Sequence, residues 1–162
     1  MTQRLNYASA SPEALRSLYE ATRYLRSKTT LEPSVLDLVF LRAAQMNGCA
    51  FCIAMHWREA KEDGLSDDQL HGLPAWREAS WYSRRERAAL TWTESLTLVA
   101  QNHVPDVVYA EVSAVFSERE LVDLTLAVTT INAWNRFAIA FRTPPETAPD
   151  VIASLKGAAA HR

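Results

Sequence analysis

Glycine is scarce in this chain of 162 residues, which contains only four. The sequence has neither the G-x-G-x-x-G fingerprint nor the G-K-[ST] run in which backbone amides cradle phosphate groups. With a formal net charge of −2, it also lacks the basic surplus that nucleic-acid binders use to neutralise phosphates. These absences argue against a nucleotide-binding loop and against a nucleic-acid partner.

Long apolar runs are absent as well. No stretch of roughly 18 or more apolar residues occurs, which is the length that a membrane-spanning helix needs, so we expect no membrane partner. The first twenty residues, MTQRLNYASASPEALRSLYE, have no apolar centre of the kind that marks a secretory signal. We therefore expect a cytoplasmic protein, in which cellular thiols keep structural disulfides reduced.

The sequence does contain helical periodicity from one end to the other. Ser11 and Pro12 supply a cap and a first-turn proline for a predicted helix. S-x-x-E capping boxes at Ser83 and Ser117 begin two more, which we expect to extend over 83–103 and 117–142. There is no convincing pair of strands, and no hairpin dipeptide stands between alternating runs. The pattern predicts an all-α fold.

The length suits one domain with a core that needs no covalent support. We expect a single domain over residues 1–162 with roughly six to eight helices. Its core would lie in 33–142, preceded by an N-terminal helix over 11–28 and followed by a short helix or tail over 146–162.

The two cysteines of the chain stand three residues apart in the stretch QMNGCAFCIAMHWREAKEDG. Asn47 and Gly48 end the preceding helix, so Cys49 falls in the first turn of the next helix and Cys52 lies one turn later on the same side. Unpaired backbone N–H groups and the helix dipole favour a thiolate there. The spacing also lets the two sulfurs meet, so the pair can alternate between dithiol and disulfide.

His56 follows Cys52 by four residues and shares its helix face. It can take a proton from the second sulfur, directly or through a water molecule. Other readings stay open. A zinc site would use these three side chains with Asp37 as the fourth ligand, although three ligands on one short helix fit a tetrahedron poorly. The cysteines could instead be small buried packing residues, and His56 could fill a packing gap. A structural disulfide is disfavoured because so short a loop restricts the unfolded chain little.

The segment DLVFLRAAQMNGCAFCIAMHWREAKEDGLS, residues 37–66, resembles the alkylhydroperoxidase D-like branch of the carboxymuconolactone decarboxylase family. The family hallmark is an acid twelve residues before C-x-x-C-x-x-x-H, with N-G before the first cysteine and M-H-x-x-x-A-x-x-x-G after the second, and every feature is present. The resemblance continues more loosely to Arg142. It implies an all-helical fold and a cysteine peroxidase that needs no haem, metal or other cofactor.

The resemblance also implies residue roles. Cys52 would be the peroxidatic cysteine, which attacks an organic or hydrogen peroxide, and Cys49 the resolving cysteine, which closes the disulfide. His56 would act as general base and relay, and Asp37 would orient His56 by a hydrogen bond, made directly or through one water. A dithiol donor, such as a lipoyl or thioredoxin-like protein, would then reduce the disulfide.

Two positions depart from the family pattern. Asp37 stands where glutamate is usual, and Phe51 stands where a proton-transferring His or Tyr is common. Slow peroxidase turnover, or another thiol task, would follow. The alternatives are a thiol-disulfide reductase or redox sensor, and a non-catalytic helical assembly protein. The cysteine pair itself argues against decarboxylation, because the decarboxylase branch generally lacks it.

The segment INAWNR brings Asn132, Asn135 and Arg136 into an otherwise apolar helix. These side chains would either hydrogen-bond between packed helices or lie near the site or a subunit interface. The helix over 117–142 is apolar nearly all round, which indicates that it is central or shared with another chain. We expect a homo-oligomer, a trimer or hexamer as in relatives of this family, with the cysteine pocket near the interface.

Overall fold

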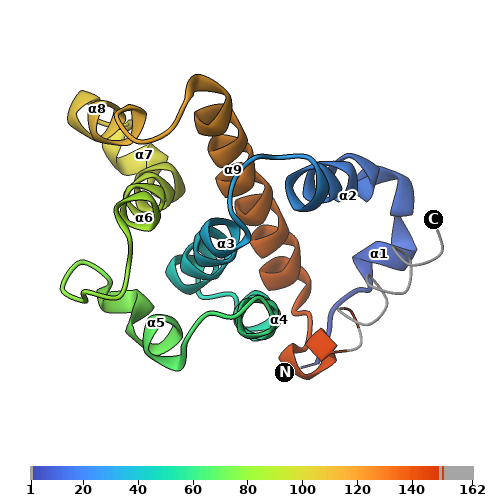
Figure 1. Ribbon diagram of the computed structural model, residues 1–162. Coiled ribbons are helices and arrows are strands. Elements are labelled where there is room, and N and C mark those ends of the chain that lie inside the picture. The colour runs from blue at the N-terminus through green and yellow to red at the C-terminus, as the bar shows by residue number, and fades with distance from the viewer. Residues whose placement is uncertain (1, 150, 152–162) are drawn as a thin grey trace.

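The protein is described from a computed structural model, in which residues 2–149 and 151 are described. The all-α prediction is confirmed, and no strand occurs in this part of the chain (Figure 1). The helix count exceeds the predicted range because α1 and α7 are single turns. The elements are α1 (Tyr7–Ala10), α2 (Pro12–Ser27), α3 (Pro33–Asn47), α4 (Ala50–Glu62), α5 (Asp67–Gly72), η1 (Leu73–Ala75), α6 (Arg84–Thr97), α7 (Val99–Asn102), α8 (Asp106–Ser113), α9 (Glu118–Phe141) and η2 (Pro145–Thr147).

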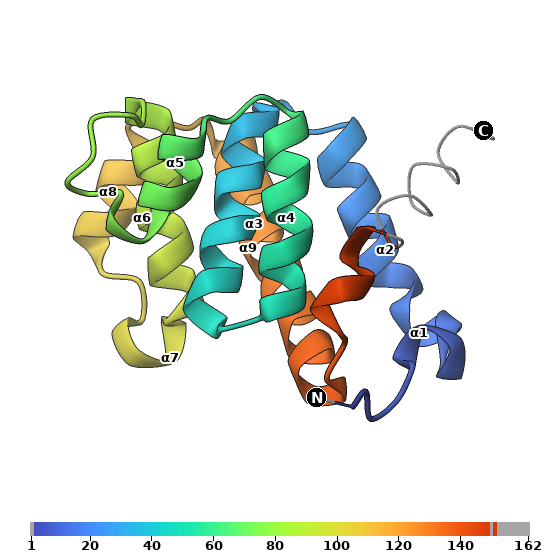
Figure 2. The same cartoon turned by 90° about the horizontal axis from the view of Figure 1, so that it is seen from below.

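Helices α3 and α9 form the centre of the molecule. α3 packs against α4, α6 and α9, while α2 lies against α9 on the other side (Figures 1 and 2). The main core is built mostly from α3, α6 and α9, with Leu124, Val128 and Ile131 of α9 buried in it. The site described below lies where α2, α3, α4 and α9 meet.

Most predicted boundaries agree with the structure. Both capping boxes form, with Ser83 capping α6 and Ser117 capping α9. The helix predicted over 83–103 is wrong in one respect, because it breaks at Leu98 and continues as α7. The chain then turns through His103 and Val104, which both have positive φ angles. The expected C-terminal element over 146–162 lies almost wholly outside the described residues.

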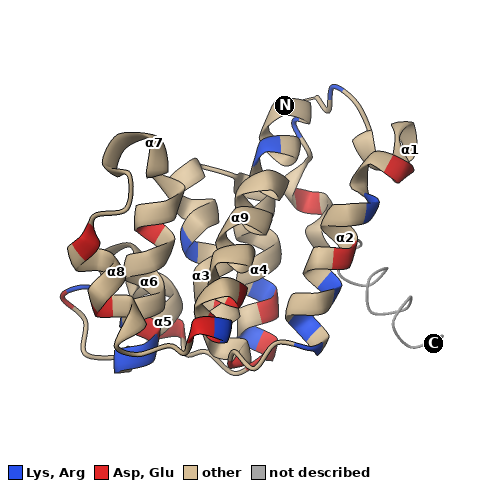
Figure 3. Cartoon of the chain, turned by 90° about the horizontal axis from the view of Figure 1, so that it is seen from above, with Lys and Arg blue, Asp and Glu red and all other residues tan. Residues whose placement is uncertain are grey.

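Charged residues gather toward one end of the helices. Figure 3 shows acidic and basic positions interspersed there, while most of α9 carries none. Arg26 near the end of α2 forms ion pairs at this end with Asp37 of α3 and Glu59 of α4. Within the described residues, no helix is long and apolar enough to cross a membrane.

Candidate functional site

Cys49 and Cys52 form a disulfide at the start of α4. Gly48 ends α3 in the left-handed conformation, with φ 69°, which glycine adopts without steric cost. Cys49 then becomes the N-cap of α4, and its sulfur accepts a hydrogen bond from the backbone N–H of Cys52 at 3.3 Å. Both cysteines are buried, and their Cα atoms are 5.3 Å apart. The prediction that the two sulfurs lie within bonding reach is confirmed.

A cavity of ≈ 560 Å³ lies beside α4 and has Cys52, but not Cys49, among its described lining residues. Most of its wall is aromatic or aliphatic, which suits an organic molecule. The large apolar contributors from the helices are Tyr7, Tyr19, Phe40, Phe51, Met55, Ile131 and Trp134. The expected position of this pocket near a subunit interface stays a prediction, and α1 and α2 of the same chain supply part of its wall.

His56 lines the same cavity. Its Nδ1 atom is 2.8 Å from Oε2 of Glu59, one turn later on α4. When Nδ1–H donates to this carboxylate, Nε2 carries the free electron pair. Nε2 is buried and has no hydrogen-bond partner among the described residues. His56 therefore presents an unused proton acceptor in the wall that also contains Cys52.

Asp37 is completely buried, and its Oδ1 accepts a hydrogen bond from Nη1 of Arg26 at 2.7 Å. Oδ2 has no hydrogen-bond partner in the described part of the chain. Burial raises the pKa of Asp37 to about 7; Arg26 opposes this rise and Asp63 adds to it. The carboxyl group is therefore able to change protonation state near neutral pH.

The direct hydrogen bond expected between Asp37 and His56 is absent from the described residues, so that form of the prediction is wrong. Glu59 shares a helix face with His56 and forms the hydrogen bond to its Nδ1. Asp37 accepts its hydrogen bond from Arg26 instead. The alternative route, through one water, stays a prediction.

Arg26 joins the two acids. Its Nη1 binds Asp37, its Nη2 binds Glu59 at 2.9 Å, and its guanidinium lies over the Phe40 ring, 5.1 Å from the centroid. Sequence reasoning missed Arg26 and Glu59. The three-residue spacing from His56 could have indicated Glu59, whereas nothing in the sequence indicates that Arg26 reaches α3 and α4. We call Arg26, Asp37 and Glu59 the arginine-acid cluster.

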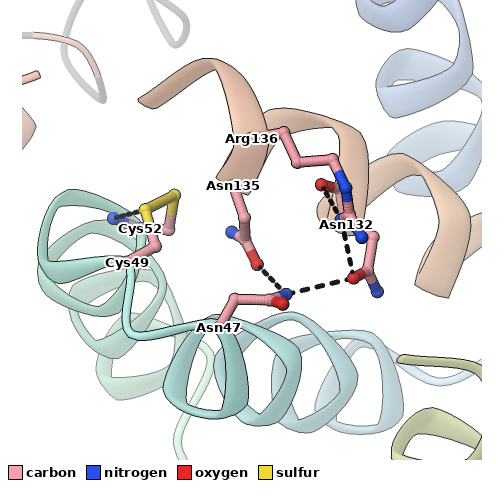
Figure 4. Close-up of a disulfide and its surroundings, with 6 residues drawn as sticks. All are labelled: Asn47, Cys49, Cys52, Asn132, Asn135 and Arg136. Carbon is pink, nitrogen blue, oxygen red and sulfur yellow. Dashed lines mark hydrogen bonds between the residues drawn. A yellow bond between two sulfur atoms is a disulfide. The ribbon is translucent and has the colours of Figure 1, made fainter. Parts of the chain in front are cut away.

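A second polar group lies on the other side of the disulfide. Asn47 Nδ2 donates to Oδ1 of Asn132 at 3.1 Å and to Oδ1 of Asn135 at 2.8 Å, and Arg136 also donates to Asn132 (Figure 4). These bonds tie α3 to α9. Both readings of the INAWNR segment therefore apply, because the helix-packing contact lies beside the cysteines.

Three of the residues considered as zinc ligands already form bonds to other side chains. Cys49 and Cys52 are bonded to each other, and Asp37 is bonded to Arg26. The described residues contain no group of three or more His, Cys, Asp or Glu side chains arranged to hold a metal ion.

Sequence comparison identifies one family and two relatives of this chain. Residues 10–95 match the model of the carboxymuconolactone decarboxylase family. The uncharacterised protein YdfG of Bacillus subtilis is 37% identical over 140 residues, which cover 86% of this chain and 95% of that protein. The uncharacterised protein YnjA of Escherichia coli is 31% identical over 121 residues, which cover 75% and 66% of the two chains.

Solved structures share the fold. A protein of unknown function from Agrobacterium tumefaciens, provisionally described as the antioxidant defence protein AhpD, has a TM-score of 0.85 and 40% identity, covering 88% of this chain and 97% of that one. The debrominase Bmp8 has a TM-score of 0.74 with 14% identity, covering 88% and 76%. At that identity, the second likeness concerns the fold alone.

Proposed function

Because the chain belongs to the carboxymuconolactone decarboxylase family, in its alkylhydroperoxidase D-like branch, we propose that it is a thiol-dependent peroxidase acting through Cys49 and Cys52. The observation that carries the proposal is the disulfide-forming pair whose second cysteine lines an apolar cavity together with His56. The overall reaction converts a hydroperoxide and a dithiol into an alcohol, water and a disulfide. It uses no haem, metal or other cofactor.

Cys52 is the peroxidatic residue in this proposal, because its side chain lines the cavity. Its thiolate attacks the outer oxygen of the hydroperoxide, the O–O bond breaks, and the alkoxide leaves with a proton as the alcohol. Cys52 becomes a sulfenic acid. His56 takes the Cys52 proton on Nε2 and returns it to the leaving oxygen.

Cys49 is the resolving residue. Its thiolate attacks the sulfur of the Cys52 sulfenic acid, hydroxide leaves with a proton as water, and the disulfide forms. A dithiol donor, such as a lipoyl or thioredoxin-like protein, then reduces the pair and leaves as a disulfide. At the N-cap, Cys49 is placed where its thiolate is stabilised by the Cys52 N–H.

The arginine-acid cluster positions His56. Glu59 holds Nδ1 and so leaves Nε2 as the basic nitrogen. Arg26 ties Glu59 to Asp37, whose raised pKa makes it a proton reservoir behind the histidine. Asp37 therefore acts on His56 through Arg26 and Glu59 or through a bridging water.

One observation favours a second candidate function. Phe51 lies between the cysteines and lines the cavity, where it can carry no proton. A protein without that proton carrier can still exchange thiols with disulfides. The second candidate is therefore a thiol-disulfide reductase or redox sensor that does not take peroxide as its natural substrate.

A peroxide-consumption assay separates these candidates. Organic hydroperoxides and hydrogen peroxide would be tested against dihydrolipoyl and thioredoxin-type donors. We expect turnover that is lost in Cys52→Ser, while Cys49→Ser should accumulate sulfinic acid on Cys52. Reduction of disulfide substrates without peroxide consumption would favour the second candidate. Unreactive cysteines in the folded protein would instead leave only a non-catalytic assembly role.

We also propose a cytoplasmic homo-oligomer, a trimer or hexamer. Large apolar side chains are exposed on two neighbouring helices, with Val107 of α8 72% exposed and Val122 of α9 68% exposed. Exposed large apolar side chains of this kind are available for burial in an interface between subunits. Sedimentation at micromolar concentration tests the proposal, and a monomer of 18.2 kDa would contradict it.

A further inference from the structure

Asn135 of α9 is completely buried, yet its amide nitrogen has no hydrogen-bond partner among the described residues. Such groups are rare, because removing an N–H from water without a new acceptor is unfavourable. In Figure 4 this nitrogen lies on the side of Asn135 that faces Cys49 and Cys52. Ala138, one turn further along α9, packs in the same apolar cluster as both cysteines. The unused donor is therefore turned toward the disulfide in this view.

Asn47 determines which end of the Asn135 amide faces the sulfurs. Its Nδ2 can only donate, and it donates to Oδ1 of Asn135 at 2.8 Å. The oxygen of Asn135 is thereby held toward α3, and its nitrogen must point elsewhere. Asn132 receives the other hydrogen bond from Asn47, but its own nitrogen donates to Thr97 and to the Val128 carbonyl. Of these three amide groups, only that of Asn135 has a nitrogen without an acceptor among the described residues.

We propose that Asn135 stabilises the thiolate of Cys49 by donating an Nδ2–H hydrogen bond to it once the disulfide is reduced. A disulfide sulfur is a weak acceptor, whereas a thiolate is a charged and strong one. The Cys49 sulfur already receives the Cys52 N–H. Reduction thus creates the acceptor that Asn135 lacks in the oxidised protein. The proposal rests on the reversible oxidation of the pair that the proposed function requires.

This contact gives disulfide exchange a direction. A thiolate of the dithiol donor attacks Cys52 from the cavity and forms a mixed disulfide, the Cys49–Cys52 bond breaks, and its electron pair leaves on Cys49. The second thiolate of the donor then attacks the donor's own sulfur in the mixed disulfide, which releases the Cys52 thiolate and leaves the donor as a disulfide. The two protons of the donor dithiol pass to the two cysteines. Because a better stabilised thiolate leaves faster, Asn135 makes Cys49 the leaving group and Cys52 the point of attack.

The first test is the dithiol–disulfide equilibrium in glutathione buffers. Asn135→Leu keeps the size of the side chain and removes the donor, and we expect a shift of about tenfold toward the disulfide, the size typical of a lost hydrogen bond to an ion. In a Cys52→Ser background, the same change should move the alkylation midpoint of Cys49 to higher pH. Asn132→Leu is the matched control, since it also removes a contact of Asn47 but leaves the Asn135 donor. Equal shifts in both variants, or none, would overturn the proposal.

A second measurement needs no variant of the network. In the unsubstituted protein, the side-chain amide resonances of Asn135 should move on reduction, while those of Asn132 stay nearly fixed. An unmoved Asn135 amide in a fully reduced protein would overturn the role assigned to it. Neither readout requires peroxide turnover. A protein that passes both tests but consumes no peroxide would contradict the peroxidase and leave the Asn135 contact standing, and the opposite outcome would contradict the contact alone.

Discussion

Two carboxylates of this protein, the buried Asp37 and the half-buried Glu94, are each paired with arginine, yet their surroundings differ. Glu94 of α6 accepts hydrogen bonds from Arg42, Arg77 and the Trp76 indole, so both of its oxygens are used. These donors lower the pKa of Glu94, although burial acts to raise it. Asp37 accepts a hydrogen bond from Arg26 on one oxygen, its other oxygen has no hydrogen-bond partner among the described residues, and the neighbouring Asp63 adds to the rise of its pKa. At Asp37 the effect of burial therefore exceeds the opposing effect of Arg26, and the pKa rises to about 7.

We interpret the pairing at Glu94 as structural and the pairing at Asp37 as functional, a proposal that rests on this difference. A carboxylate whose acceptor sites are filled stays charged and holds its neighbours in place. One that is half satisfied titrates near neutral pH and can exchange a proton, which is typical of functional sites. Asp37 is linked to His56 in the cavity wall through hydrogen bonds of Arg26 and Glu59. Glu94 instead joins α6 to α3 and to the segment after η1. The following predictions test this contrast.

The largest expected effect is on stability at Glu94. Glu94→Leu leaves the half-buried Arg42 and the Trp76 N–H without their acceptor, and we expect a loss of about 3 kcal/mol in the free energy of unfolding. Urea denaturation measures it. Glu13→Leu is the control, because Glu13 forms an exposed pair with Arg16 and such pairs contribute little. Peroxide turnover should persist in folded Glu94→Leu, and its loss there would contradict a purely structural role.

The two acids should also give stability opposite dependences on pH. The folded pKa of Asp37 is about 7, above its ordinary 3.8, so the folded state binds more protons between these values. Stability should therefore fall as pH rises through this window, by at most about 1.4 kcal/mol per pH unit. The pKa of Glu94 is lowered from 4.5, so its contribution is present above that value and is lost as pH falls through the folded pKa.

Unfolding by urea across the acid-to-neutral range measures both dependences. Asp37→Asn should remove the fall toward neutral pH, while Glu94→Gln should preserve it and change only the acid side. If Asp37→Asn leaves the fall intact, another group is responsible for it.

The next effect concerns turnover. Asp37→Asn keeps the shape of the side chain but removes its proton exchange, so we expect peroxide turnover to fall by roughly tenfold and the rate profile to lose its inflection near neutral pH. Asp123→Asn is a matched control. Asp123 is also buried, but it accepts hydrogen bonds from Tyr24 and Thr29 away from the cysteines. Unchanged turnover and profile in Asp37→Asn would refute the proton role.

Much of the fold could be predicted because its signals are local. The S-x-x-E boxes at Ser83 and Ser117 determine where α6 and α9 begin, and Gly48 determines where α3 ends. The break at Leu98 could not be predicted, because no Gly or Pro stands there. His103 and Val104 then adopt positive φ angles with no sequence signal for such a turn.

The candidate site divides in the same way. Cys49, Cys52 and His56 lie on one helix, so their spacing alone brings them together. Asp37 was placed near them by family resemblance, but its partner depends on how α2 packs across α3 and α4. Contacts between helices far apart in sequence, such as those of Arg26, leave no periodic signal in a single chain. The preference of His56 for Glu59 over Asp37 therefore needed the structure.

The smallest expected effect would sharpen the contrast most. Arg26→Lys keeps the positive charge but replaces a planar fork, which binds Asp37 and Glu59 with separate nitrogens, by a single ammonium group that cannot hold both in that geometry. We expect peroxide turnover to fall by about threefold, less than in Asp37→Asn, since the charge beside the acid remains. Arg23→Lys on the same helix is the control, because Arg23 forms an exposed pair with Glu20. Kinetics across pH would show the inflection assigned to Asp37 moving in Arg26→Lys and staying fixed in Arg23→Lys. Identical profiles in the two variants would mean that Arg26 only packs against Phe40, and that the arginine-acid cluster is as structural as the pairing at Glu94.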